Sequence, residues 1–150
     1  MQVSPQAIQV VKKVIGEHRW IELPAKGTSM YPYIKEGDIC TFETCALPDL
    51  EKGDVILFHN VQGQLISHRF IKTTMIDGNR YLMCKGDTNF GFDEPILPQQ
   101  VIGKLMYIKR RNIHSSASAW SAILWREAIL RFPSLTHMLR VYVNRKAVRY

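Results

Sequence analysis

The chain contains the segment Lys26-Gly27-Thr28-Ser29-Met30-Tyr31-Pro32-Tyr33-Ile34-Lys35-Glu36-Gly37-Asp38, which sets two glycines and a proline around one serine. Glycine accepts backbone conformations that other residues avoid, and proline fixes its own φ and favours extended geometry at the residue before it. This composition predicts an irregular turn that presents Ser29 outside any helix or strand. A serine in such a loop is most often structural, so its function depends on what the rest of the chain brings to it.

Outward from this segment, short apolar runs alternate with turns, a pattern typical of β-strands. Residues 54–59 form a near-continuous apolar run, which is consistent with a buried strand, and Asp77-Gly78-Asn79 is a strong hairpin signal. We therefore expect a mostly β fold, a twisted antiparallel sheet or partly open barrel. The predicted strands lie at 20–23, 39–43, 54–59, 65–75, 80–84 and 101–108, with a loop over 85–98.

Helical patterns lie at the two ends of the chain. Ser4-Pro5 is a typical N-cap followed by proline at the first helical position, and apolar residues recur at helical spacing as far as Ile15, with the next residue, a glycine, as the expected end. Residues 119–132 predict a helix whose polar residues do not gather on one face. A proline then interrupts the pattern, and residues 135–143 predict a second, shorter helix.

The bulk composition is that of one ordinary globular domain. The 150 residues are 46% hydrophobic and 22% charged, and the chain is long enough to bury a core. The net charge of +7 belongs to the tail, because residues 104–150 hold ten basic residues and one acidic residue. Two tryptophans and a run of aliphatic residues accompany this charge. The tail therefore fits either peripheral contact with an anionic membrane, or a helical lid or dimer patch packed on the β domain.

Cysteine usage and hydropathy bear on the compartment. Cys40, Cys45 and Cys84 include no CxxC pair and favour a reducing compartment over a disulfide framework. The Cys and His residues show no metal-ligand spacing, so we expect neither a metal nor a cofactor. The N-terminus lacks the features of a signal peptide, and no run approaches the length of about 18 apolar residues that a spanning helix needs. We therefore expect a cytoplasmic protein, and membrane association is one of the two alternatives that the tail leaves open.

Three segments could assemble a nucleophilic site: the Ser29 turn, the strand around His68, and the loop that holds Asp87 and Asp93. A serine hydroxyl needs a base within about 2.6–3.2 Å and a third group that orients the base. Histidine accepts and returns a proton near neutral pH, and a carboxylate on its other ring nitrogen fixes the tautomer. Taken singly each signal is weak, since strand alternation places His68 on an apolar face, where histidine is usually a core residue.

Together, the order and spacing of these motifs resemble those of type I signal peptidases. Gly27-x-Ser29-Met30-x-Pro32, followed by Gly37-Asp38, is similar to their nucleophile box. His68-Arg69 is similar to the general-base box of the endoplasmic-reticulum and archaeal branch, in which histidine replaces the lysine of the common bacterial branch. The resemblance covers roughly residues 25–108, and the other boxes are Gly53-Asp54-Val55-Ile56-x-Phe58, Lys85-Gly86-Asp87-x-Asn89 with Asp93, and Val101-Ile102-Gly103-Lys104.

The resemblance implies a serine endopeptidase of the LexA/signal-peptidase type that cleaves a leader or signal-type peptide. The catalytic domain would span residues 25–110, after an N-terminal helix and lead-in (1–24) and before the basic helical tail (111–150). A peptide or precursor protein would be the substrate.

The resemblance also implies a role for each site residue. Ser29 would be the nucleophile, with its backbone amide in the oxyanion hole, and His68 the general base. Asp93 is the favoured orienting carboxylate and Asp87 would hold the loop, although the sequence leaves the orienting role open between them. The substrate-binding residues would be Met30 and Pro32.

The chain departs from the family in one respect. Signal peptidases place a membrane-spanning helix just before the serine box, whereas the helix predicted here is too short to span. Two other interpretations therefore stand beside the peptidase: a catalytically silent peptide-binding module with the same fold, and a peripheral membrane or scaffold protein that uses the tail. No helix-turn-helix is recognisable before the domain, so nucleic acid is not an expected partner.

Overall fold

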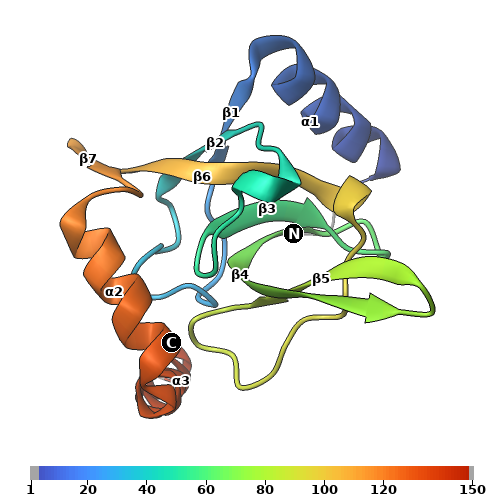
Figure 1. The fold of residues 1–150 in the computed structure, drawn as a ribbon. Helices are drawn as coiled ribbons and strands as arrows, with labels where there is room; N and C mark the ends of the chain where they lie inside the picture. Colours follow the sequence, from blue (N-terminus) through green and yellow to red (C-terminus); the bar gives the residue numbers. More distant parts are fainter. Residues whose placement is uncertain (1–3, 149–150) are drawn as a thin grey trace.

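The computed structural model describes residues 4–148, which form a mostly β protein built on one antiparallel sheet. The strand order is β1-β2-β6-β3-β4-β5, with β7 paired to β6, and the sheet does not close into a barrel. The expected mostly β class, with a helix before the sheet and helices after it, is therefore confirmed (Figure 1). The strands are β1 (Trp20–Pro24), β2 (Ile39–Glu43), β3 (Val55–His59), β4 (Leu65–Ile76), β5 (Asn79–Lys85), β6 (Val101–Arg110) and β7 (Ile113–Ser116).

Three α-helices flank this sheet: α1 (Pro5–His18), α2 (Trp120–Arg131) and α3 (Pro133–Ala147). Helix α1 lies at one end of the molecule, and α2 and α3 lie at the other (Figure 1). Proline begins α3 because its fixed φ and missing N–H suit the first helical position, so this helix starts earlier than predicted. Within residues 4–148, no helix has the length and apolar character that crossing a bilayer requires.

The two ends of α1 show how local signals succeed and fail. The Ser4 hydroxyl accepts a hydrogen bond from the Ala7 N–H at 3.2 Å, as the N-cap pattern predicts. The helix then continues through Gly16 to His18, and the cap residue Arg19 is left-handed with φ of 72°. The predicted end was therefore wrong, because the residue that adopts the left-handed cap ends the helix here, and that residue is not the glycine.

Strand β7 was not predicted, while the six predicted strands are present to within two residues at each end. Its four residues are exposed or half-buried and mostly polar, so they show no apolar alternation. A turn at Arg111, with φ of 54°, instead brings them back to pair with β6. Backbone hydrogen bonding to a neighbour, and not side-chain burial, therefore forms this strand.

The core has two parts, one on each side of β3. Leu57 belongs to a cluster with Phe42, Leu105 and Met30, whereas Ile56 belongs to a cluster with residues of β4 and β5. Because successive side chains of a strand point to opposite faces, β3 is buried on both sides. This double burial explains the continuous apolar run of β3. The Met30 side chain, which is 4% exposed, packs in the same cluster as Leu57 and so anchors the segment that carries the serine.

Candidate active site

The segment that presents Ser29 is closed at its base by hydrogen bonds around Asp38. The Ala25 N–H donates to the Asp38 carbonyl oxygen at 2.7 Å, and the Lys35 N–H donates to Asp38 Oδ2 at 2.8 Å. Arg110 of β6 binds both carboxylate oxygens, at 2.9 and 2.6 Å. Desolvation raises the pKa of Asp38, but the hydrogen bonds from Arg110 and Lys35 outweigh it, so the pKa lies below its usual value. The base of the turn is thus tied to the sheet.

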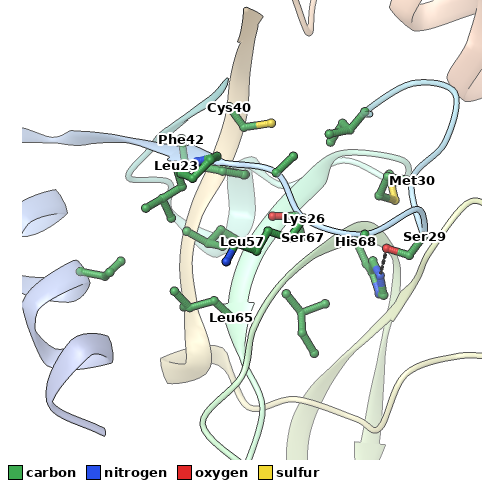
Figure 2. A pocket seen from close by; sticks show the side chains of 16 residues that line it. Leu23, Lys26, Ser29, Met30, Cys40, Phe42, Leu57, Leu65, Ser67 and His68 are labelled. Atoms are coloured by element: carbon green, nitrogen blue, oxygen red, sulfur yellow. Dashed lines mark hydrogen bonds between the residues drawn. The ribbon is translucent and has the colours of Figure 1, made fainter. Parts of the chain in front are cut away.

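Ser29, His68 and Asp93 form one continuous chain of hydrogen bonds. Ser29 Oγ lies 2.9 Å from His68 Nε2 (Figure 2). On the other side of the ring, His68 Nδ1 lies 2.6 Å from Asp93 Oδ2. With the ring proton on Nδ1, the imidazole donates to the carboxylate and accepts from the Ser29 hydroxyl. His68 is only 7% exposed, so burial and both partners hold its ring in place. The three side chains come from a turn, from β4 and from a loop, and only the fold brings them together.

Asp93 reaches His68 because the loop after β5 folds back along that strand. The Asp93 N–H donates to the Cys84 carbonyl oxygen at 2.8 Å, and Ile96 forms an antiparallel bridge with Leu82. These bonds attach the loop to β5 at Asp93 and again three residues beyond it. The segment predicted as loop is therefore irregular but closely attached to the sheet.

Asp87 makes a different contact from Asp93. Its two oxygens accept from Arg69 Nε at 2.6 Å and Arg69 Nη2 at 2.9 Å, and both side chains are at most 4% exposed. Arg69 also donates to the Gly53 carbonyl oxygen at 2.9 Å and lies over the Tyr33 ring at 4.9 Å from its centroid. The structure thus places Asp93 at His68, and Asp87 at the residue that follows His68.

The acidic loop also holds the backbone of the nucleophile. The Thr88 N–H donates to the Ser29 carbonyl oxygen at 3.0 Å, and Thr88 is completely buried. A Cβ at Gly86 would lie 2.9 Å from that same oxygen, so only glycine allows this close approach. The Ser29 N–H donates to no protein group within residues 4–148. Within these residues, an unpaired N–H donor therefore lies beside the Ser29 hydroxyl.

An apolar cleft with a volume of about 470 Å³ begins at Ser29 and His68. Figure 2 shows these two side chains at one end of the cleft, and Leu23, Phe42 and Leu65 at the other. Of the predicted substrate-binding residues, Met30 lines this cleft and Pro32 does not. Pro32 lines a separate cavity, of about 310 Å³, beside α2 and β7.

Two strand edges form the walls of the cleft. Strand β1 pairs with β2 on one side, and residues Leu23–Pro24 line the cleft. Strand β4 pairs with β3 from Leu65 onward, but its pairing with β5 begins only at Arg69. Residues 65–68 of β4 therefore have no strand partner on the β5 side, and these residues line the cleft. An extended peptide can add to edges of this kind through main-chain hydrogen bonds, with side chains in the apolar floor.

The sequence did not indicate the cleft-wall residues Leu65 and Ile66, nor that Trp125 of the tail contacts the acidic loop. Trp125 of α2 donates its indole N–H to Asp87 Oδ2 at 3.0 Å. Its place 38 positions beyond Asp87 gives no local signal. Leu65 and Ile66 belong to a predicted strand, but a strand pattern does not say which edge stays free.

The site contains the groups that nucleophilic catalysis needs: a hydroxyl, a base within hydrogen-bond distance, and a carboxylate that orients the base. Over residues 4–148, no three His, Cys, Asp or Glu side chains are placed to hold a metal ion. No protein-family model and no curated protein sequence matches this chain.

Proposed function

We propose that this chain is a serine endopeptidase of the LexA/signal-peptidase type that cleaves a leader or signal-type peptide. The observation that carries the proposal is the hydrogen-bonded chain Ser29–His68–Asp93, with distances of 2.9 and 2.6 Å, at the end of an apolar cleft. The resemblance of residues 25–108 to type I signal peptidases supports it independently, since it rests on the order of motifs along the chain.

In the proposed reaction, Ser29 Oγ attacks the scissile carbonyl carbon while His68 Nε2 takes the hydroxyl proton. The Ser29 N–H stabilises the developing oxyanion, and Asp93 stabilises the imidazolium and keeps its orientation. His68 then gives the proton to the leaving amine, which leaves an acyl-serine. A water molecule, activated by the same imidazole, hydrolyses the acyl-serine and restores the free hydroxyl.

The test is proteolysis by wild type and Ser29→Ala, followed by intact-mass and new-terminus mass spectrometry of a co-expressed peptide precursor and of a mixed peptide library. We expect wild type to cut at defined bonds and Ser29→Ala to cut none while keeping the same melting temperature. The matched control is Ser134→Ala, which removes an exposed hydroxyl of α3. Equal cleavage by Ser29→Ala and wild type would refute the assignment of the nucleophile.

A catalytically silent peptide-binding module is the second candidate, and the free strand edges of the cleft favour it. Main-chain pairing with β1 or with residues 65–68 of β4 does not depend on the Ser29 hydroxyl. Peptide binding that survives both Ser29→Ala and His68→Ala, without turnover by wild type, would select this function.

We also propose peripheral contact between the tail and an anionic membrane. Trp120, Leu124 and Met138 are 75%, 57% and 65% exposed on α2 and α3, and Arg131 and Arg145 lie on the exposed surface of the same helices. Apolar and basic side chains together favour an anionic lipid surface. Co-sedimentation with vesicles of phosphatidylglycerol, but not with vesicles of phosphatidylcholine alone, would support this role. No sedimentation with either kind of vesicle, or no preference for the anionic one, would contradict it.

A further inference from the structure

Helix α2 contacts the acidic loop through a partly buried hydrogen bond to Asp87. Trp125 Nε1–H donates to Asp87 Oδ2 at 3.0 Å, and that oxygen also accepts from Arg69 Nη2 at 2.9 Å. The other oxygen accepts from Arg69 Nε at 2.6 Å. Asp87 is 3% exposed, so protein donors must satisfy its charge. The tail therefore supplies one of the three side-chain donors of a buried carboxylate.

The neighbouring residue of α2 packs where a side chain at Gly53 would lie. Gly53 has φ of 96°, and a Cβ there would overlap Cγ and Cδ of Arg126. The Gly53 carbonyl oxygen accepts from Arg69 Nη1 at 2.9 Å. Helix α2 thus packs against two groups that hold the Arg69 guanidinium, the Asp87 carboxylate and the Gly53 backbone.

Helix α3 adds two aromatic contacts to the same region. Tyr142 stacks on Tyr31, two residues after Ser29, with ring centroids 5.6 Å apart. His137 lies against Phe90, between Asp87 and Asp93, at a centroid distance of 5.7 Å. The tail consequently touches both the turn that carries the nucleophile and the loop that carries its acidic partners.

The contacts of the acidic loop connect Asp87 to each member of the Ser29–His68–Asp93 chain. Thr88, the next residue, donates to the Ser29 carbonyl oxygen at 3.0 Å. Arg69, the partner of Asp87, directly follows His68 on β4. Asp93 lies six residues further along the same loop and reaches His68 Nδ1 at 2.6 Å. A shift of Asp87 would therefore change the positions of all three groups.

We infer that Trp125 is a positioning residue for the candidate site: through Asp87 it fixes the loop that sets the geometry of Ser29, His68 and Asp93. Its effect on catalysis rests on the proposed function, whereas its effect on the His68–Asp93 hydrogen bond does not. The tail is then part of the site's framework, and the catalytic unit extends beyond residues 25–110 to include α2.

The test compares Trp125→Phe, which removes the indole N–H and keeps an aromatic ring, with Trp120→Phe. Trp120 is 75% exposed on the same helix, so the second variant is a matched control. Two readouts are measured in the full chain: the downfield NMR signal of the His68 Nδ1 proton, and the rate at which a fluorophosphonate probe modifies Ser29, followed by intact mass.

We expect Trp125→Phe to weaken or shift the His68 signal and to slow Ser29 modification about tenfold, because a hydrogen bond to a charged group is lost. Trp120→Phe should match wild type in both. Trp125→His, which keeps a ring N–H, should recover part of the effect. Peptide turnover should show the loss in kcat with little change in KM, since the cleft does not contain Trp125.

A His68 signal and a labelling rate that are unchanged in Trp125→Phe would overturn the inference. So would a Trp125→Phe chain that fails to fold, because the bond would then support the whole domain and not the loop. If wild type is not labelled at Ser29, the proposed function fails instead, and the His68 signal still decides the role of Trp125.

Discussion

At the scale of single residues, Asp93 is the group whose removal tests the orientation of His68. Asp93→Asn replaces the acceptor at His68 Nδ1 with an amide that favours the wrong tautomer. We expect kcat for peptide cleavage to fall about 10⁴-fold, with little change in the melting temperature. Steady-state kinetics on the peptide identified with wild type provides the measurement. Glu94→Gln, at the exposed neighbouring carboxylate, should leave kcat unchanged, and an Asp93→Asn enzyme as active as this control would contradict the role.

A second residue-scale prediction concerns the close approach of two backbones. In Gly86→Ala the new methyl group would lie 2.9 Å from the Ser29 carbonyl oxygen, so the acidic loop and the nucleophile turn must move apart. We expect cleavage to fall at least tenfold and the free energy of unfolding to fall by about 1–3 kcal/mol, as with other overpacked sites. Gly91→Ala is the control in the same loop, because a Cβ there meets nothing within 4 Å. Equal losses in both variants would show that loop flexibility matters and that the contact does not.

At this scale the sequence predicted which residues form the candidate site better than it predicted their contacts. Ser29, His68 and Asp93 were named from the motif order, and the structure brings them together. The choice between Asp87 and Asp93 stayed open, because both lie in one loop and only its folded path decides which carboxylate faces the imidazole. Nothing near Pro32 in the sequence shows that its side chain lies outside the cleft.

At the scale of secondary-structure elements, the strands protect two of the three thiols. Burial raises the pKa of Cys40 on β2 to about 12, and burial raises the pKa of Cys84 on β5 to about 12. Burial also raises the pKa of Cys45, but this thiol lies after β2 and is only partly buried. At about pH 8, fewer than about one in 10³ of the strand thiols would then be thiolate, the reactive form.

We therefore expect iodoacetamide to alkylate Cys45 first in the folded protein, and Cys40 and Cys84 only when β2 and β5 open. Peptide mass spectrometry after timed alkylation measures each site, and the guanidinium-unfolded chain, in which all three should react alike, is the control. Native alkylation of Cys84 as fast as that of Cys45 would mean that β5 is not stably attached to the sheet.

The elements also show which local signals are reliable. The apolar run of β3 and the turn at Asp77-Gly78 between β4 and β5 correctly predicted these strands, because each signal lies in residues that are adjacent in sequence. Strand β7 was missed because its pairing with β6, and not an apolar pattern, creates it. The end of α1 was misplaced because Arg19 takes the left-handed conformation that the sequence assigns to Gly16.

At the scale of the whole molecule, the Asp38–Arg110 pair joins the nucleophile segment to the sheet across 72 positions. The folded-state pKa of Asp38 lies below its ordinary value of 3.8, despite desolvation, because of its hydrogen bonds to Arg110 and Lys35. Its contribution to stability is therefore fully present above about pH 4 and is lost as the pH falls through the folded-state pKa.

We accordingly expect Asp38→Asn to lower the free energy of unfolding at neutral pH, with the difference from wild type shrinking in acid below about pH 4. Urea unfolding at a series of pH values measures this difference. Asp49→Asn, at an exposed carboxylate, should instead follow the wild-type pH profile. A difference between Asp38→Asn and wild type that stays constant into acid would show that the carboxylate charge is not responsible.

The sequence by itself determined the mostly β class, the positions of six strands and three helices, and the identity of the serine, histidine and carboxylates of the candidate site. The fold class and its elements depend on alternation in strands and on the turn residues between them. The site residues depend on the resemblance of the motif order to a known family. Tertiary structure alone decided that Asp93 meets His68, that Asp87 pairs with Arg69, and that Trp125 reaches Asp87. These contacts join residues 18 to 38 positions apart. They depend on loop paths and side-chain directions that form only when the core packs.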